Sequence, residues 1–483
     1  MVNLVWFRRD LRVHDHPALA AAFATGLTVG VYVIDPHEWD GNGASRPGMA
    51  AQRRRFRIES LRALRESMRR LGSELAILTG DPADQLVKFA RTHHIDTIFA
   101  SREPGSIEAR DEKRLVEMVE GKLAMRWFPS NELIPISQLP FELNQAPELF
   151  TTFRQMVEKG MRVAALTPIP RPQTGLTIND PGEIPNAPDS PARGHCLLGG
   201  EPAGRSRLDH YTMETRALRR YKETRNGMLK LDDSSKLSPY LADGSLSVRT
   251  VFHTVKQFER EYGANESTYW LIFELLWREF FRVMTHKHAS RLFQVEGFQR
   301  LALPWSQDEA LFTKWCEGQS GIPLIDANMI ELRETGYMSN RGRQIVGSYL
   351  TKALNIDWRW GARWFEHHLV DFDPASNYGN WQYIAGVGND GREFRVFNPR
   401  KQAESYDPKA EYVKYWLPQL RPLEAKLANE PHRQDRVPYP FPIVDFNQKV
   451  EENRRAYESL VKREEPKRPS GPVQGEPPRH RRR

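Results

Sequence analysis

The sequence predicts an α/β domain followed by an all-α domain, and three observations lead to this fold class. In residues 1–130, short apolar runs alternate with amphipathic stretches, as in a parallel sheet with helices on both faces. Residues 131–205 form a long linker that is rich in proline toward its end. In residues 206–465 the apolar pattern is helical, without strand-like alternation. Residues 466–483 are basic and proline-rich, and we expect a disordered tail.

The first domain is predicted to be Rossmann-like, with a five-stranded parallel sheet. No GxGxxG or GxxxxGK[ST] motif follows any strand, so the layout carries no dinucleotide or P-loop signature. The arginines of the long helix at 51–71 are expected to form a solvated face, with a nucleic-acid contact as the alternative. The candidate strands are residues 4–7, 28–34, 75–78, 97–100 and 125–128, and the other candidate helices are residues 17–23, 83–92 and 107–119.

The composition is that of a soluble protein with a basic surplus. Lys and Arg number 70 against 62 Asp and Glu, which suits a polyanionic partner, although part of the surplus lies in the tail. Cys196 and Cys316 are too few for a disulfide framework or a Cys₄ metal site, and free thiols are favoured. No apolar run approaches the roughly 18 residues of a spanning helix, and the first residues are typical of a strand, not a signal peptide. We therefore expect a cytoplasmic protein.

A loop rich in hydroxyl groups precedes a helix in the second domain. Residues 234–241 read Ser-Ser-Lys-Leu-Ser-Pro-Tyr-Leu. Backbone N–H groups and the helix dipole favour an anion at such a point, so a pyrophosphate cradle is one interpretation. A serine-rich capped turn is the other, and the loop alone favours it.

A carboxylate and a tryptophan lie three residues apart in an apolar helix. Glu274 and Trp277 share one helix face within residues 269–285, which are apolar almost all round and must be buried. A buried carboxylate is costly without a partner. It is either ion-paired with an arginine or faces a cavity beside an aromatic platform, where a flipped base could lie.

Polar side chains are concentrated between residues 336 and 420. They can meet the donors and acceptors of a heteroaromatic ring, although Asp371-x-Asp373 could instead be a hard-metal site. The surrounding aromatic and amide residues favour a planar organic cofactor. Tryptophan is frequent, with 12 residues in the chain, and most of these are expected in the core. The polar residues are Asn340, Arg343, Asp371, Asp373 and Asn377.

Several long strings, in the same order along nearly the whole chain, resemble the photolyase/cryptochrome superfamily. They are WFRRDLR at 6–12 followed by HPAL at 16–19, ELLWREFF at 274–281 and NYGNWQY at 377–383. The DASH cryptochromes are the branch that the chain resembles in YKETRN at 221–226, STYW at 267–270, WQYIAG at 381–386, and FNP at 397–399 followed by YDP at 406–408.

The resemblance implies a U-shaped FAD in the helical domain. It assigns the phosphates and ribityl region to a set of residues around the serine loop, and the isoalloxazine ring to a second set. Asn377 would lie beside flavin N5, and Glu274 would border the cofactor. The first set is Tyr221, Ser234, Ser235, Lys236, Leu237 and Ser238, and the second is Asn340, Arg343, Asp371 and Asp373.

The resemblance also implies an electron-transfer chain and a lesion site. Trp381, Trp358 and Trp305 match the chain from flavin to surface, although three core tryptophans are the alternative. Glu274 and Trp277 match residues that contact a flipped pyrimidine dimer. Related 6-4 photolyases carry histidines where this chain has Asn340 and Gln344, which favours cyclobutane dimers. Tyr383 stands where duplex-active enzymes usually have Trp, which favours single-stranded or unpaired DNA.

The expected activity is therefore light-driven repair of cyclobutane pyrimidine dimers by a monomer that binds single-stranded or damaged DNA, or RNA, without sequence preference. The expected antenna of the first domain is a methenyltetrahydrofolate, for which Glu108 matches the family's acidic position better than Glu103 does. The alternative function is a blue-light photoreceptor that binds nucleic acid and signals through FAD photoreduction. A photochemically silent flavoprotein that binds DNA is a third interpretation.

Overall fold

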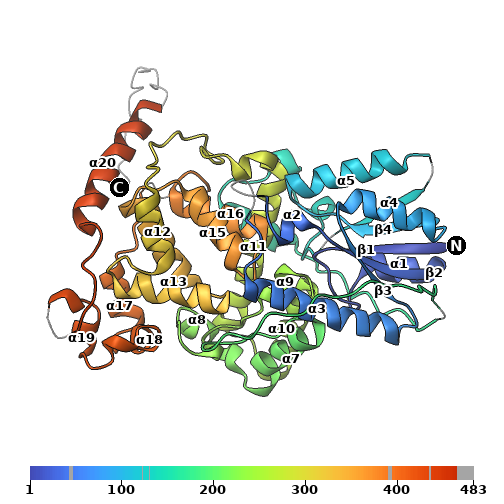
Figure 1. Cartoon of the computed structure of the whole chain (residues 1–483), viewed down its shortest axis with the longest axis horizontal. Coiled ribbons are helices and arrows are strands. Elements are labelled where there is room, and N and C mark those ends of the chain that lie inside the picture. The colour runs from blue at the N-terminus through green and yellow to red at the C-terminus, as the bar shows by residue number, and fades with distance from the viewer. Residues whose placement is uncertain are drawn as a thin grey trace, which may run out of the picture.

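The computed structural model describes residues 1–483 except 43–46, 122, 130, 174, 390–393, 434–436 and 465–483. The tail predicted at 466–483 lies outside the described residues. The domains are an N-terminal α/β unit and a helical unit, at opposite ends of the view in Figure 1. This confirms the predicted fold class.

The five predicted strands form one parallel sheet. They are β1 (Val2–Phe7), β2 (Leu27–Ile34), β3 (Leu75–Thr79), β4 (Thr97–Ser101) and β5 (Ala124–Phe128), in the order β3-β2-β1-β4-β5. Leu4 of β1 pairs with Val29 of β2 on one side and with Ile98 of β4 on the other. The order reverses between β1 and β4, so the loops after these two strands diverge and leave room at their carboxyl ends.

Helices cover both faces of the sheet (Figure 1). α1 (Pro17–Thr25) and α3 (Ala51–Arg70) share one apolar core with the sheet. α4 (Pro82–Thr92) and α5 (Ser106–Val119) share the core on the other face. All four match the predicted helices, and the sequence analysis missed only the short α2 (Pro36–Trp39) among the described residues of this domain.

Only part of α3 carries the solvated arginine face that the sequence suggested, since Arg62, Arg69 and Arg70 are exposed but three other arginines are not. Arg53, Arg55 and Arg57 are buried at 5%, 2% and 7% exposure. Arg53 donates to the carbonyl oxygen of Glu366 at 2.5 Å and Arg55 to that of Leu197 at 2.9 Å. For Arg53 and Arg55 the expectation was wrong, because their guanidinium groups satisfy carbonyl groups that come from distant parts of the chain, and α3 thereby joins the two domains.

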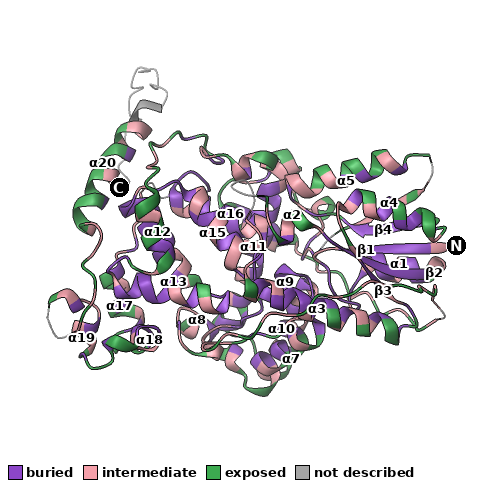
Figure 2. Cartoon of the chain, viewed as in Figure 1, coloured by how far each residue is buried: buried purple, intermediate pink, exposed green. Residues whose placement is uncertain are grey.

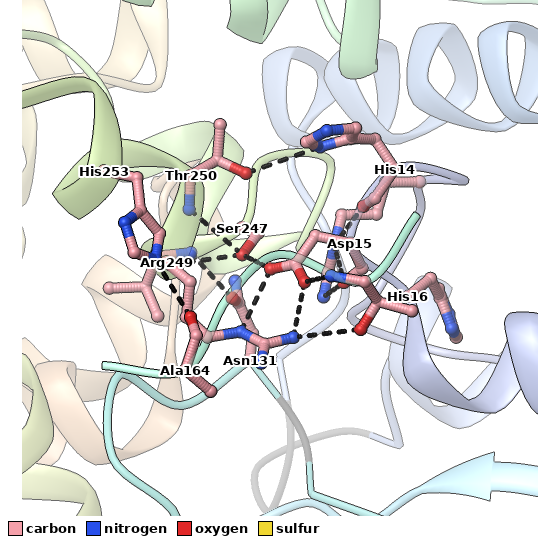
Figure 3. Close-up of polar contacts among 12 residues, drawn as sticks. His14, Asp15, His16, Asn131, Ala164, Ser247, Arg249, Thr250 and His253 are labelled. Atoms are coloured by element: carbon pink, nitrogen blue, oxygen red, sulfur yellow. Dashed lines mark hydrogen bonds and ion pairs between the residues drawn. The ribbon is translucent and has the colours of Figure 1, made fainter. Parts of the chain in front are cut away.

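A second set of contacts joins the loop after β1 to the helical domain. Asp15 is fully buried with φ 52°, and Figure 3 shows its carboxylate between Arg249 and Ser247. Arg249 Nε lies 3.1 Å from Asp15 Oδ2, and the Ser247 hydroxyl donates to the same oxygen. The backbone N–H of Thr167 donates to Asp15 Oδ1 at 2.9 Å. One buried carboxylate thus connects the first domain, the linker and the helical domain.

The predicted linker at 131–205 is partly helical. It contains α6 (Phe150–Gly160), whose Phe150, Phe153 and Val157 belong to the core of the helical domain, and α7 (Glu201–Asp209) begins before its end. The described residues between 161 and 200 contain neither helix nor strand. The remaining boundaries between domains stay a prediction.

The helical domain is built around α11 (Glu266–His288), which lies near the middle of the molecule in the view of Figure 1 and carries buried and intermediate residues in Figure 2. Its buried positions occur on most sides, as the apolar pattern predicted. No helix of the described part of the chain is long and apolar enough to cross a membrane. The other helices are α8 (Tyr221–Thr224), α9 (Ser238–Ala242), α10 (Val248–Tyr262), α12 (Glu309–Glu317), α13 (Pro323–Thr335), α14 (Asn340–Ser348), α15 (Trp358–His368), α16 (Pro374–Ala385), α17 (Pro399–Tyr406), α18 (Glu411–Trp416), α19 (Ala425–Ala428) and α20 (Phe446–Glu464).

Candidate functional site

Two adjoining cavities lie beside α11 in the helical domain. The first, which we name the serine-lined cavity, has a volume of about 240 Å³ and is bordered by the loop at 234–238, α11, α14 and the start of α16. The second, the tryptophan-lined cavity, has a volume of about 410 Å³. They share a wall that is formed by Arg225, Glu274, Arg278, Asn340 and Ser376.

The serine-lined cavity brings together residues that are far apart in the sequence. Every residue that the resemblance assigned to the FAD phosphates, ribityl region and ring lines it, except Asn377. Lys236 has φ 55° and is 3% exposed, and its ammonium lies 4.6 Å from the centroid of the Tyr337 ring. A cation held in a strained backbone conformation beside three serine hydroxyls suits a diphosphate.

An arginine that the sequence analysis did not single out holds this loop from behind. Arg207 of α7 is 7% exposed and contacts four acceptors in the loop before α9. Its Nε donates to Ser235 O at 2.9 Å, and its Nη2 to Ser234 O at 3.1 Å and Leu231 O at 3.3 Å. Its Nη1 donates to Asp232 Oδ1 at 2.6 Å. These bonds fix the backbone on which the serine hydroxyls stand.

Two carboxylates close the far side of the serine-lined cavity. Asp371 accepts from Arg343 Nη2 at 2.7 Å and from the Ser238 hydroxyl at 2.7 Å. Asp373 caps α16 by accepting from the Ser376 N–H at 2.8 Å. Burial would raise the pKa of Asp373, but Arg282 and Arg278 outweigh it and hold that pKa below its usual range.

These pairings account for the acids without a metal ion. Asp371 is neutralised by Arg343, and Asp373 lies 3.9 Å from Arg282. Among the described residues, no group of three His, Cys, Asp or Glu side chains is placed to hold a metal. The set of hydroxyl, ammonium, guanidinium, amide and carboxylate groups instead fits the donors and acceptors of FAD.

The tryptophan-lined cavity has an aromatic wall on one face of α11. Trp270, Phe273, Trp277 and Phe281 recur at spacings of three and four residues and so point the same way. Trp277 stacks on Phe150 of α6, with ring centroids 3.7 Å apart and planes inclined by 14°. The Tyr383 ring lies nearly perpendicular to it, with the ring centroids 5.8 Å apart and the planes inclined by 86°. One face of the Trp277 ring is thus supported by α6.

Basic side chains also line this cavity. Arg341 and Arg395 line it together with Gln344 and Asn380. Arg225 lies on the wall that the two cavities share and donates to Glu274 Oε1, while its guanidinium lies 4.7 Å from the Trp270 ring centroid. Burial raises the pKa of Glu274, and Arg225 opposes this shift without cancelling it. Both interpretations of Glu274 therefore hold, because it is ion-paired and it also faces the cavities.

Asn377 and the three matched tryptophans line neither of the two cavities. Asn377 is 8% exposed and lines neither cavity, and its Nδ2 donates to Ala362 O at 3.0 Å. Trp381 and Trp358 are buried in α16 and α15, two helices in contact. Trp358 Nε1 donates to Val295 O at 3.0 Å. Trp305 is half-buried and makes no ring contact with the described residues.

Glu108 lies elsewhere, between the two domains. It lines a cavity of about 350 Å³, which we name the cleft cavity, with Phe372, Tyr378, Arg359 and Arg363. Its Oε1 lies 3.2 Å from Arg9 Nη2. Glu103 does not line the cleft cavity but a smaller one of about 70 Å³ beside it, and burial raises its pKa to about 7.

The sequence reasoning missed several wall residues of the two adjoining cavities. Arg278 and Phe281 belong to the string ELLWREFF at 274–281. They follow Glu274 by four and seven residues, which places them on the same face of α11, so helical periodicity could have identified them. Arg341, Arg395 and Phe397 come from other segments, and only the fold brings them near α11.

Comparisons with known proteins agree with this architecture. Residues 3–173 match the family model described as DNA photolyase, and residues 270–459 match the FAD binding domain of DNA photolyase. Cryptochrome DASH of Gloeobacter violaceus is 42% identical over 97% of this chain and 98% of its own length. Cryptochrome DASH of Xenopus laevis is 37% identical over 92% and 90%.

Solved structures give the same result. The crystal structure of a cryptochrome from Synechocystis has a TM-score of 0.90 and 40% identity, and the match covers 94% of this chain and 99% of that one. A class III photolyase from Agrobacterium tumefaciens has a TM-score of 0.82 and 30% identity, with coverage of 95% and 98%. The chain therefore belongs to the photolyase/cryptochrome family and, within it, to the DASH cryptochromes, whose FAD-binding domain it carries.

Proposed function

We propose that the protein is a light-driven repair enzyme that splits cyclobutane pyrimidine dimers in single-stranded or otherwise unpaired DNA. It would act as a monomer, in the cytoplasm. The observation that carries this proposal is the wall shared by the two cavities. A cofactor in the serine-lined cavity and a base in the tryptophan-lined cavity would be separated by little more than Glu274, Arg225 and Asn340.

Each cavity has the chemistry of its proposed occupant. Reduced FAD supplies a light-driven electron that opens the dimer ring and then returns, with no net redox change. Lys236 and the serine hydroxyls bind its diphosphate, while Asp371 orients Arg343 at its ring. Asn377, a neutral amide held by Ala362, is the residue that we place beside flavin N5, where an amide supports the reduced flavin.

The tryptophan-lined cavity has what a flipped lesion requires. Trp277 offers a ring face for stacking, worth about 1–3 kcal/mol per base. Glu274 hydrogen-bonds the pyrimidine edge and stabilises the radical anion of the lesion by donating a proton or a hydrogen bond. Arg341 and Arg395 attract the phosphates around the lesion. None of these contacts reads sequence, so binding to DNA, or to RNA, is nonspecific.

The preference for unpaired DNA follows from Tyr383. Flipping two bases out of a duplex costs a few kcal/mol, which stacking in the cavity must offset. Tyr383 meets Trp277 edge to face and presents a smaller ring than Trp would. A lesion in single-stranded DNA costs less free energy to flip and so needs less stacking in the cavity, which makes it the better substrate.

The cleft cavity is the proposed site of a methenyltetrahydrofolate antenna. A pterin edge carries adjacent N–H donors, and a single carboxylate, here that of Glu108, can accept hydrogen bonds from both. Phe372 and Tyr378 offer apolar contacts to the ring, and Arg359 and Arg363 suit the carboxylates of its glutamate tail. The cavity of about 350 Å³ is within the size range of small-molecule sites.

Blue-light reception through FAD photoreduction is a second candidate function. It is favoured by Trp381 and Trp358, which are buried on contacting helices and offer one-electron donors that dimer splitting itself does not use. Trp305 is proposed as the outer member of this chain. Repair remains the first proposal because Glu274 and Trp277 face the cavity that a sensor has no need of.

The test is dimer splitting under blue light, with the FAD-loaded full chain reduced beforehand. The substrates are oligonucleotides that carry one thymine cyclobutane dimer, as a single strand and as a duplex. We expect faster repair of the single strand, and no repair in the dark. If neither substrate is repaired, the enzyme proposal is wrong. Equal rates on both would overturn the argument from Tyr383 alone.

A further inference from the structure

We propose that Tyr378 is a further redox residue, which gives an electron to oxidised Trp358 and its phenolic proton to Glu366. This inference rests on the proposed photochemistry, in which light-excited FAD oxidises Trp381 and then Trp358. The resemblance suggested that the electron-transfer chain ends at Trp305, near the surface. The inference adds Tyr378 as a second, buried end of this chain.

Tyr378 lies where an electron can pass from it to Trp358. It is on α16, three residues before Trp381 and on the same side of the helix. Its ring centroid lies 6.2 Å from that of Trp358, with the planes inclined by 79°. Trp358 is fully buried and Tyr378 is 6% exposed. Trp305, in contrast, makes no ring contact with any described residue, so Tyr378 is the closer aromatic neighbour of Trp358.

A proton acceptor stands at the hydroxyl of Tyr378. The hydroxyl donates to Glu366 Oε2 at 2.7 Å, and Glu366 is 8% exposed. This distance is that of a hydroxyl–carboxylate hydrogen bond and is within the reach of a general base. Glu366 lies eight residues after Trp358 on α15, so one helix carries both the electron acceptor and the proton acceptor.

Arginine side chains surround Glu366. Arg53 of α3 donates to the backbone carbonyl of Glu366 at 2.5 Å, and the charge of the Glu366 carboxylate acts on its guanidinium. Arg363 and Arg359 border the same cleft cavity as Tyr378 and Glu366. The Glu366 carboxylate is the hydrogen-bond partner that can take the proton which the phenol of Tyr378 must lose when it is oxidised.

The step balances in charge and atoms. One electron passes from Tyr378 to the oxidised Trp358 ring, the O–H bond of Tyr378 breaks, and its proton forms an O–H bond with Glu366 Oε2. The positive charge of oxidised Trp358 and the negative charge of Glu366 disappear together, and a neutral tyrosyl radical remains. The step therefore leaves the net charge of this buried region unchanged, and it separates no new charges, which would be costly there. The radical is therefore a trap that slows return of the electron.

The experiment detects the radical itself in the FAD-loaded full chain with its flavin oxidised. After a blue flash and freezing, electron paramagnetic resonance separates tyrosyl from tryptophanyl radicals, and a spin trap followed by peptide mass spectrometry locates them. We expect a tyrosyl radical on the peptide that contains Tyr378. In Tyr378→Phe it should vanish while the tryptophanyl signal grows. In Glu366→Gln its yield should fall at least tenfold.

The matched control is Tyr349→Phe. Tyr349 is also fully buried, but its hydroxyl has no hydrogen-bond partner. This variant should keep the tyrosyl signal. A signal that survives in Tyr378→Phe, an unchanged yield in Glu366→Gln, or the absence of a tyrosyl radical in the wild type overturns the inference. Bound FAD and thermal stability are measured for each variant, so that loss of folding is not mistaken for loss of the radical. Dimer splitting with chemically reduced FAD tests the proposed repair function separately, because it needs no oxidation of Trp358.

Discussion

The guanidinium of Arg225 and the carboxylate of Glu274 form an ion pair on the wall between the two cavities. Their side chains are 22% and 28% exposed, so the pair is neither dry nor free in solvent. Arg225 also lies over Trp270. It therefore holds Glu274 in place while leaving the second carboxylate oxygen for a base in the tryptophan-lined cavity.

Glu274→Gln should lower the yield of dimer splitting by on the order of 10²-fold, the scale of one lost acid–base group. The amide keeps the size and one acceptor of the carboxylate but loses its charge and its exchangeable proton. The measurement is repair of single-stranded dimer by chemically reduced protein at equal bound FAD. Glu66→Gln, on the exposed face of α3, is the control and should keep full activity. A yield within twofold of wild type would show that Glu274 takes no part in dimer splitting.

Trp277→Ala should weaken binding of a dimer-containing single strand by about 5- to 150-fold, since one stacked base is worth 1–3 kcal/mol. Trp277→Phe keeps part of the ring face and should lose less. Fluorescence anisotropy with damaged and undamaged strands makes the comparison. The undamaged strand should bind all three proteins alike, because phosphate contacts dominate there. Equal losses on both strands would instead indicate damage to the packing against Phe150.

Tyr383→Trp should narrow the difference between single-stranded and duplex substrates. The larger ring adds stacking area beside Trp277 and so offsets more of the cost of flipping. Repair rates on both substrates are compared for wild type and variant. We expect the repair rate on the duplex to rise at least threefold and the rate on the single strand to change little. A threefold change corresponds to part of the free energy of one stacking contact. An unaltered ratio would show that another feature sets the preference.

The sequence predicted the elements of this fold better than the surroundings of their side chains. Strand and helix positions follow from local periodicity, which is why all five strands and the long α11 were found. Burial of Arg53 and Arg55 could not be predicted in this way, because their acceptors, Glu366 O and Leu197 O, are more than a hundred residues away. Alternating arginines look the same whether they face water or another domain.

The candidate site shows the same limit. The serine loop and Asp371 are separated by more than 130 residues, and only the family resemblance brought them together in advance. The composition around α6 predicts a linker because the prolines that follow it dominate, although Phe150, Phe153 and Val157 have helical spacing. Arg207 was missed for another reason. Its role lies in four backbone and side-chain contacts to the loop, which leave no pattern in the sequence.

Arg207→Lys should lower the affinity for FAD at least tenfold. A lysine cannot reach all four acceptors, and a hydrogen bond that involves a charged group contributes about 1.5–3 kcal/mol. The serine loop then loses the backbone geometry that presents its hydroxyls. FAD titration of the apoprotein, followed by flavin fluorescence, gives the affinity. The control is Arg205→Lys, an exposed position on the same helix. If both variants bind FAD as wild type does, the loop is held by other contacts.

In wild type, the free energy of unfolding should fall as the pH rises, and Glu331→Gln should make this fall smaller. Glu331 is buried on α13 behind the serine-lined cavity, and the Tyr412 hydroxyl donates to it at 2.6 Å. Burial raises its pKa to about 7, from 4.5, against the opposing effect of Tyr412, Lys236 and Arg343. A carboxyl whose pKa is raised on folding stabilises the protein fully below its unfolded pKa, and this contribution is lost as pH rises through the folded pKa.

The window is therefore between pH 4.5 and about 7, and the shift corresponds to roughly 3 kcal/mol of unfolding free energy. Urea unfolding of wild type and variant at pH 5 and pH 8 measures it. Glu103 and Glu132, whose pKa values are also raised to about 7, are common to both proteins and cancel in the difference. Gln keeps the acceptor for Tyr412 but has no charge to bury, so the variant should gain relative to wild type at pH 8. The exposed Glu309→Gln serves as control. Parallel stability profiles for wild type and Glu331→Gln would show that Lys236 and Arg343 already compensate the ionised carboxylate.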